Sequence, residues 1–365
     1  MAEIAIKSRI YLDHAATTPA CAAALAALAE AAAITGNPSS VHAGGRVANG
    51  IIERARDAIA DWADCKPGGI VFTSGGSEAL ALALNTPWRV LVGATEHSAV
   101  LAARPDAAMI AVDGNGIIDM AALDCALANG PALVAIQHAN NETGVIQPIA
   151  EIAARVAAAS GRLLVDAVQS AGKLPLPDAD YVAISAHKLG GTPGTGALIA
   201  RNVETLSAVQ RGGGQERGLR GGTPNLPGIA AFAAAISAAT DWHKIAALRD
   251  ALEVRLQTRI HGANAPFVAG ANAQRLPNIS SITLPGVAST VQVMTLDLAG
   301  FMVSAGAACS SGKVASSHVL AAMGLGEAAG QAIRISLGPQ TSAAEVAAFG
   351  GAWLAMAARR AKVAA

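Results

Sequence analysis

The chain has no excess of charge of either sign. Its 365 residues include 26 lysines and arginines and 26 aspartates and glutamates. Because nucleic-acid binding relies on basic side chains that neutralise phosphates, this balance argues against nucleic acid as a direct partner. Only 14% of the residues are charged while 52% are hydrophobic, which argues against a disordered chain and against a coiled coil.

The sequence also lacks a hydrophobic run long enough to span a membrane. The longest apolar stretches, such as residues 228–239, are rich in alanine and fall short of the roughly 18 residues that a spanning helix requires. The first residues carry charges early and contain no long apolar segment, which argues against a secretory signal. We therefore expect a globular, cytoplasmic protein with no membrane partner.

Cysteine and histidine are too few and too scattered to indicate a disulfide framework or a metal site. The four cysteines form no CxxC pair and the eight histidines form no HxxxH pair. Cys21, Cys65 and Cys125 have the surroundings of ordinary core or helix residues, whereas Cys309 lies in the small-residue run SAGAACSSGKVASS. A cysteine on a mobile loop can attack a substrate when it is a thiolate; an incidental surface thiol is the alternative.

Short apolar runs alternate with alanine-rich stretches through the first 200 residues. We expect helices at 120–128 and 149–159, and strands at 68–76, 88–94, 107–113, 131–139, 161–167, 180–186 and 195–200. Strands that are apolar on both faces and separated by helices indicate an α/β fold with a mostly parallel sheet. Because only a short glycine-rich loop precedes residues 195–200, we expect that strand to be antiparallel.

The remainder of the chain predicts a smaller α+β domain. A helical run extends from Gly228 to about Arg259 with a break near 241–243, followed by a strand at 278–286, a helix at 291–299 and a strand at 332–338. We expect a large domain over residues 15–244 and a small domain formed by residues 1–14 plus 245–365. Neither a low-complexity linker nor an internal repeat is visible.

A glycine turn follows the first of these strands. Gly75, Gly76 and Ser77 lie between a strand and a helix, where free backbone N–H groups bind anions and glycine lets a phosphate approach closely. The turn matches neither the P-loop nor G-x-G-x-x-G, which argues against an NTPase and against a Rossmann dehydrogenase. A tight turn in which Ser77 caps the helix is the alternative.

Asp166 and Lys188 follow two other predicted strands, at the ends where open α/β sheets bind their ligands. Each alone is typical of a helix cap or a solvated side chain. Together with the glycine turn they supply what pyridoxal 5'-phosphate (PLP) requires, namely a lysine for covalent attachment, an anion for the ring nitrogen and donors for the phosphate. The sequence therefore predicts a PLP enzyme.

A series of motifs in chain order resembles the cysteine desulfurases, which belong to the class V aminotransferase group of fold-type I PLP enzymes. The motifs are YLDHAATT, GNPSSVHAGG, FTSGGSE, TEHSAVL, NNETGVIQPI, VDAVQSAGK, SAHKLGGTPGTGALI, GGGQERGLRGGT, SAGAACSSG and IRISLG. They span nearly the whole chain. The resemblance implies conversion of L-cysteine to L-alanine, with the sulfur left as a persulfide on the enzyme.

The resemblance also assigns cofactor roles to residues in these motifs. Lys188 would bind PLP covalently and act in catalysis, Asp166 would pair with the pyridine nitrogen, and Gln169 would hydrogen-bond the phenolate oxygen. His97 would stack on the ring as a further catalytic residue. The phosphate would be held by Gly76, Ser77, Ser185 and His187.

The same resemblance assigns substrate and partner roles. Asn141 and Arg334 would hold the substrate carboxylate, which a guanidinium fork matches with two hydrogen bonds; an interdomain salt bridge is the alternative for Arg334. Thr223 would reach the phosphate of a neighbouring subunit's cofactor, which implies a homodimer. Cys309 would form the persulfide on a loop that resembles the longer, more mobile subtype, and an acceptor protein would take the sulfur for iron–sulfur clusters or thiolation.

The sequence departs from the family pattern at the rim of the predicted phosphate site. GSEALALAL lacks the usual asparagines, the span from Ser77 to His97 is shortened, and Ala186 replaces a glycine. The alternatives are another class V PLP enzyme (an aminotransferase, an epimerase or a selenocysteine lyase) and a non-enzymatic scaffold. The presence of both Lys188 and Cys309 argues against the scaffold.

Overall fold

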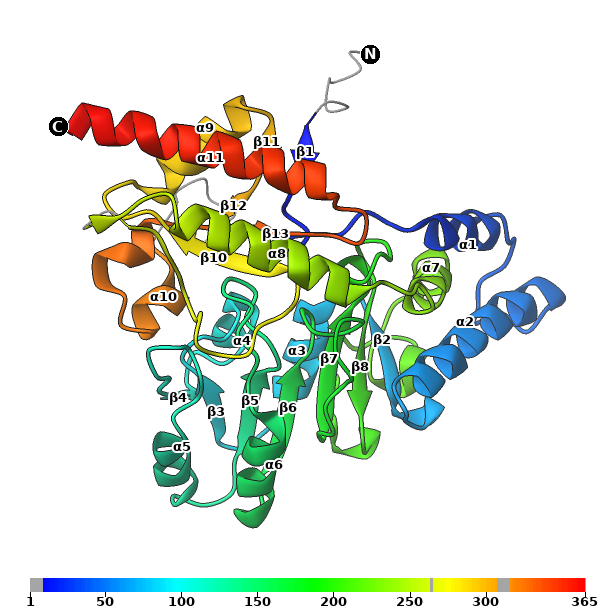
Figure 1. Cartoon of the computed structure of the whole chain (residues 1–365). Helices are drawn as coiled ribbons and strands as arrows, with labels where there is room; N and C mark the ends of the chain where they lie inside the picture. Colours follow the sequence, from blue (N-terminus) through cyan, green and yellow to red (C-terminus); the bar gives the residue numbers. More distant parts are fainter. Residues whose placement is uncertain (1–8, 263–264, 307–315, 365) are drawn as a thin grey trace.

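Seven strands form the large sheet of the protein (Figure 1): β2 (Ile70–Thr73), β3 (Val90–Gly93), β4 (Ala108–Ile110), β5 (Leu133–Gln137), β6 (Arg162–Asp166), β7 (Tyr181–Ser185) and β8 (Gly196–Ala200). The structure, a computed structural model, describes residues 9–262, 265–306 and 316–364. The strand order is β2-β8-β7-β6-β5-β3-β4. Only the pairs made by β8 are antiparallel, so the predicted mostly parallel sheet with one antiparallel strand is confirmed.

Helices cover both faces of this sheet: α1 (Ala22–Ala32), α2 (Ala43–Trp62), α3 (Gly76–Leu84), α4 (Ser98–Ala103), α5 (Met120–Leu127), α6 (Ile149–Ala158) and α7 (Leu226–Ile236). Side chains of a strand alternate between its faces, and β5 shows the consequence. Val134 and Ile136 belong to the core formed with α2, α5, α6 and α7, whereas Leu133 and Ala135 belong to the core with α3 and α4. The apolar strands of the sequence are therefore buried on both sides.

The C-terminal part is built on a smaller antiparallel sheet, in the order β12 (Ser304–Ala305), β13 (Ala332–Ser336), β10 (Ile279–Thr283) and β9 (Phe267–Val268). Its helices are α8 (Trp242–Gln257), α9 (Ser289–Leu298), α10 (His318–Ala322) and α11 (Ala343–Ala364), the last lying across the top of Figure 1. The predicted break in the long helical run lies between α7 and α8, at residues 237–241.

The N-terminal segment joins this C-terminal part. Strand β1 (Ile10–Tyr11) pairs in parallel with β11 (Phe301–Met302), and Asp13 forms a bridge with Ser336. Leu12 shares a hydrophobic core with α8, α9 and α11, separate from the cores of the large sheet. This packing supports our proposed division into residues 15–244 and residues 1–14 plus 245–365.

Two further expectations concern membranes and cysteines. Within the part of the chain that the structure describes, no helix is both long enough and apolar enough to cross a bilayer. Cys21 and Cys65 are half-buried at helix ends, and Cys125 is exposed on α5. All three have free thiols, while Cys309 lies outside the described residues.

Candidate active site

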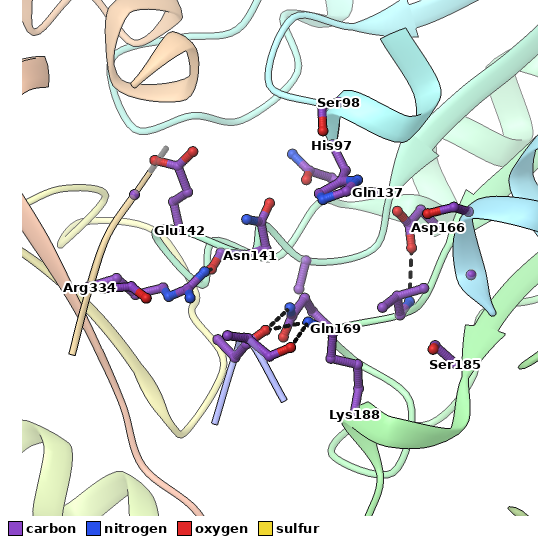
Figure 2. A pocket seen from close by; sticks show the side chains of 18 of the residues that line it. His97, Ser98, Gln137, Asn141, Glu142, Asp166, Gln169, Ser185, Lys188 and Arg334 are labelled. Atoms are coloured by element: carbon purple, nitrogen blue, oxygen red, sulfur yellow. Dashed lines mark hydrogen bonds between the residues drawn. The ribbon is translucent and has the colours of Figure 1, made fainter. Parts of the chain in front are cut away.

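A cavity of about 470 Å³ opens at the carboxyl ends of the large sheet's parallel strands, between that sheet and the C-terminal part. Its lining includes ten of the residues predicted from the sequence, namely Gly76, Ser77, His97, Asn141, Asp166, Gln169, Ser185, His187, Lys188 and Arg334. Figure 2 shows most of these side chains converging from different elements.

The strand topology explains this convergence. Asp166 is the last residue of β6 and Ser185 the last of β7, while Lys188 lies in the single 3-10 turn that follows β7. Because β6 and β7 are parallel neighbours, their carboxyl ends meet at one edge, where open α/β sheets bind ligands. The loop before α4 brings His97 to the same edge.

The glycine turn forms one wall of the cavity. Helix α3 begins at Gly76 after the cap residue Gly75, so Ser77 lies inside the first turn and does not cap the helix in the way that the alternative held. The first amides of a helix have no acceptor within it, which leaves Gly76 and Ser77 free to bind an anion. A Cβ at position 76 would lie 2.5 Å from Val168 Cγ2, so only glycine preserves this wall.

Lys188 is held at the cavity by backbone carbonyl groups. Its Nζ atom donates to the carbonyl oxygens of Ala15, at 2.5 Å, and Ala16, at 2.8 Å, as the dashed lines of Figure 2 show. Burial, together with the charge of Arg334, lowers the pKa of Lys188 to about 8, against the attraction of Asp13 and Asp166. A neutral amine is therefore accessible near physiological pH.

Asp166 is a buried carboxylate. Its Oδ1 atom accepts a hydrogen bond from the N–H of Val168 at 2.9 Å. Burial raises the pKa of Asp166 to about 6, although that hydrogen bond and the charge of Lys188 both lower it. A ligand that presents a protonated ring nitrogen to Asp166 would give this carboxylate a cation in direct contact.

Gln169 and His97 complete the cofactor side. Gln169 Nε2 donates to the carbonyl of Ala15 at 2.9 Å. His97 caps α4, and its Nδ1 atom accepts the N–H of Ala99 at 3.1 Å. Burial, with the nearby charge of Lys188, lowers the pKa of His97, which favours an uncharged ring able to stack on an aromatic ligand.

These observations fit PLP. The cavity offers an amine of lowered pKa, a buried carboxylate of raised pKa, a neutral imidazole and free amides at the start of a helix. Burial also lowers the pKa of His187, to about 4, so its ring too is neutral near the predicted phosphate site. The donor set matches the reactive aldehyde, the ring and the phosphate of this cofactor.

The opposite wall carries Arg334, on β13. Its Nη2 atom donates to Asp13 Oδ1 at 2.8 Å and its Nη1 atom to the backbone carbonyl of Asn141 at 3.0 Å. Arg334 therefore forms a salt bridge, as the alternative prediction held. Its partner Asp13 belongs to the segment that joins the C-terminal part, so the salt bridge lies within that part. The Nε atom is buried and has no hydrogen-bond partner among the described residues, which leaves a donor for a substrate carboxylate.

Sequence reasoning missed several side chains of this wall. Ser304 donates its hydroxyl to Asp13 Oδ2 at 2.7 Å, and Glu142 and His318 also line the cavity. Asp13 and Glu142 stand inside the motifs YLDHAATT and NNETGVIQPI, so the motifs pointed to their segments without identifying them. Ser304 and His318 carry no recognisable local signal.

Two predicted site residues are absent from the described lining of this cavity, for different reasons. Thr223 is exposed and lies outside the cavity lining. Cys309 lies outside the described residues, although Gly306, three positions before it, belongs to the lining.

Comparisons with known proteins show the family of the chain. The family model described as "Aminotransferase class-V" matches residues 10–349. A cysteine desulfurase of Cereibacter sphaeroides is 39% identical over 362 residues, which cover 93% of each chain. An IscS-like cysteine desulfurase of Mycobacterium tuberculosis is 34% identical, over 92% of this chain and 93% of the relative.

Solved structures share the fold. The NifS-like protein from Rickettsia africae superposes with a TM-score of 0.86 at 32% sequence identity. The match covers 95% of this chain and 99% of that protein. The likeness therefore extends over both the large sheet and the C-terminal part.

Proposed function

Since the chain belongs to the aminotransferase class-V family, and within it to the cysteine desulfurases, we propose how its own residues remove sulfur from L-cysteine. It is a PLP-dependent enzyme of fold type I. The mechanism rests on one observation: Lys188, Asp166 and Arg334 line the same cavity. When bound, PLP supplies an electron sink for the bonds that break at the amino acid.

The large sheet holds the cofactor. When PLP is bound, Lys188 would anchor it through Nζ, Asp166 would keep its ring nitrogen protonated, and Gln169 would hydrogen-bond its phenolate oxygen. The residues that would bind the phosphate are Gly76, Ser77, Ser185 and His187. Because the pKa of Lys188 is lowered to about 8, its amine can take the proton from the substrate Cα atom and return it.

The C-terminal part holds the substrate. Arg334 binds the carboxylate of L-cysteine through the Nε–H group, which has no partner among the described residues, while Asp13 fixes the guanidinium from its other side. Asn141, next to this pair, completes the carboxylate site. A charge-assisted hydrogen bond of this kind would hold the carboxylate end of the amino acid at Arg334.

Cys309 accepts the sulfur in this proposal. Its thiolate attacks Sγ of the substrate, the S–S bond forms as the Cβ–Sγ bond breaks, and the electron pair stays with carbon, which gains a proton to give L-alanine. The persulfide then passes to an acceptor protein that serves iron–sulfur clusters or thiolation. The support is the position of Gly306 in the cavity lining, three residues before Cys309.

Mapping of the transferred sulfur tests this assignment. After one turnover with L-cysteine and no reductant, mass spectrometry should find an added sulfur atom on the peptide that contains Cys309. Cys309→Ser should release almost no alanine, because an alcohol is a poor nucleophile toward sulfur, while Cys125→Ser at an exposed position should behave as wild type. Normal turnover of Cys309→Ser, or sulfur on another cysteine, would overturn the assignment.

A cytoplasmic homodimer is the second part of the proposal. Thr223 is exposed and outside its own cavity, as expected of a residue that serves a partner's cofactor phosphate. The segment before it is anchored by Glu216, whose carboxylate accepts hydrogen bonds from Arg56 at 2.8 Å and from the N–H of Phe72 at 2.9 Å. Sedimentation should give a dimer at assay concentration, with an interface above about 2,000 Å²; a fully active monomer would contradict it.

A further inference from the structure

Glu142 places a buried carboxylate at the rim of the cavity, where neither PLP nor the substrate carboxylate needs one. Only 3% of the residue is exposed. Burial raises the pKa of Glu142, against a hydrogen bond from Ser317 and the charges of His318 and Arg334. A buried carboxylate costs free energy unless its contacts compensate, so its contacts indicate its role.

Those contacts are with two residues far along the chain. Ser317 Oγ donates to Glu142 Oε2 at 2.6 Å, across 175 positions of sequence. The same oxygen lies against Gly306, because a Cβ built there would be 2.1 Å from Glu142 Oε2. Figure 2 shows Glu142 pointing toward the short segment that ends β12.

Gly306 and Ser317 stand on either side of Cys309 in the sequence. Gly306 follows β12, whose Ser304 pairs with Arg334 on β13. Ser317 caps α10 by accepting the N–H of Leu320 at 3.1 Å. The small sheet thus holds Gly306 through β12, and α10 holds Ser317. Glu142 Oε2 contacts both residues from the side of the cavity.

We propose that Glu142 is a positioning residue for sulfur transfer: its carboxylate fixes Gly306 and Ser317 and thereby sets the approach of Cys309 to the substrate sulfur. This inference rests on the proposed function, in which Cys309 is the acceptor. In this proposal Glu142 acts through its contacts with Gly306 and Ser317, and not on the cofactor or the transferred sulfur. Its loss therefore affects the transfer step and leaves cofactor and substrate binding intact.

The test compares two steps of one turnover in the holoenzyme. In Glu142→Ala, transfer of sulfur to Cys309 should slow by about 10- to 100-fold, the cost of misplacing a reacting group by roughly 1 Å. The change in cofactor absorption on adding L-cysteine should keep its wild-type rate and concentration dependence. Glu142→Gln keeps the length and an acceptor oxygen, so it should restore transfer to within a few-fold of wild type.

A double-mutant cycle gives an independent readout. Gly306→Ala introduces a methyl group against Glu142 Oε2 and should slow transfer in the wild-type background. In the Glu142→Ala background the same change should cost much less, because the oxygen is gone and the two substitutions are coupled. Strictly additive effects would overturn the inference.

The outcomes separate the two proposals. If wild-type sulfur does not map to Cys309, the proposed function fails. If it does, and Glu142→Ala transfers sulfur at the wild-type rate, only the positioning role fails. Equal losses in absorption change and in transfer would show general damage to the site and would also overturn it.

Discussion

The two walls of the active site are built in different ways. On the cofactor wall, each functional side chain sits where its own strand or turn delivers it: Asp166 ends β6, and Lys188 follows β7 directly. On the substrate wall, the functional side chains depend on distant partners: Arg334 pairs with Asp13 across 321 positions, and His318 bonds the carbonyl of Glu96 across 222. The strand topology positions the residues of the cofactor wall, whereas packing between distant segments positions those of the substrate wall.

The comparison predicts that substitutions in the cofactor wall abolish the reaction, whereas substitutions in the substrate wall raise KM by amounts that depend on the contact removed. Lys188→Ala should remove the absorption of covalently bound cofactor and lower desulfurase activity by at least about 10²- to 10⁴-fold, the usual contribution of a catalytic acid–base group. Lys244→Ala, an exposed lysine on α8, is the matched control and should leave both unchanged. Visible absorption and alanine release measure the two effects.

The two walls also differ in how far the sequence alone predicts them. Strand periodicity and glycine turns are local signals that one chain carries in short segments. The apolar runs end close to the observed ends of β6 and β7, so the sequence alone predicts that Asp166, Ser185 and Lys188 share one sheet edge. The positions and roles of Asp166 and Lys188 on the cofactor wall could therefore be derived from residue patterns, whereas the stacking role of His97 came only from the resemblance.

The substrate wall could not be derived in this way. Nothing local in the sequence pairs Asp13 with Arg334, or Glu142 with Ser317. The first pair forms only when the N-terminal segment joins the C-terminal sheet, and the second only when α10 packs against the loop after β5. The alternative of a cap at Ser77 is wrong because the cap residue is Gly75, two positions earlier, and a serine after two glycines does not reveal this locally.

The second prediction concerns the charge of the cofactor wall when PLP has been removed. Asp166→Asn should stabilise the cofactor-free protein at neutral pH, because the folded state raises the pKa of this carboxyl from 3.8 to about 6. The stability that the protonated group supplies below pH about 4 is lost as the pH rises through about 6, and the difference between those pKa values is worth about 3 kcal/mol.

Urea denaturation of the cofactor-free proteins from pH 4 to pH 8 measures this effect. Variant and wild type should have similar unfolding free energies near pH 4, should diverge between pH about 4 and about 6 in favour of the variant, and should keep a constant difference above that range. Asp119→Asn is the control, since Asp119 caps α5 at the surface and asparagine caps equally well. A gap that is already constant over the whole pH range would contradict the assignment to Asp166.

The third prediction tests the substrate wall directly. Arg334→Lys keeps the positive charge but loses the planar fork that serves Asp13, the carbonyl of Asn141 and the substrate at once. We expect KM for L-cysteine to rise by about 10- to 100-fold, as for loss of one to two charge-assisted hydrogen bonds. Absorption of the bound cofactor should be unchanged.

A matched control for Arg334 exists at the surface. Arg9 pairs with Asp297, but their side chains are 38% and 50% exposed. Arg9→Lys should therefore leave KM within experimental error, because exposed ion pairs contribute little. If Arg334→Lys altered cofactor absorption as strongly as KM, the two walls would not be separable.

The smallest effect is expected at Ser304, a residue of the substrate wall that contacts Asp13. Its hydroxyl donates to Asp13 Oδ2 at 2.7 Å, so Ser304→Ala removes one hydrogen bond from the carboxylate that orients Arg334. A loss of about 1 kcal/mol in this orientation would raise KM about fivefold without changing cofactor absorption. Ser342→Ala removes a similar bond, from Ser342 Oγ to Glu345 Oε2 at 2.8 Å, at an exposed site, and should lower stability slightly while KM stays constant. Steady-state kinetics and urea denaturation of both variants distinguish these outcomes, and an unchanged KM in Ser304→Ala would mean that Arg334 is oriented without help from this distant partner.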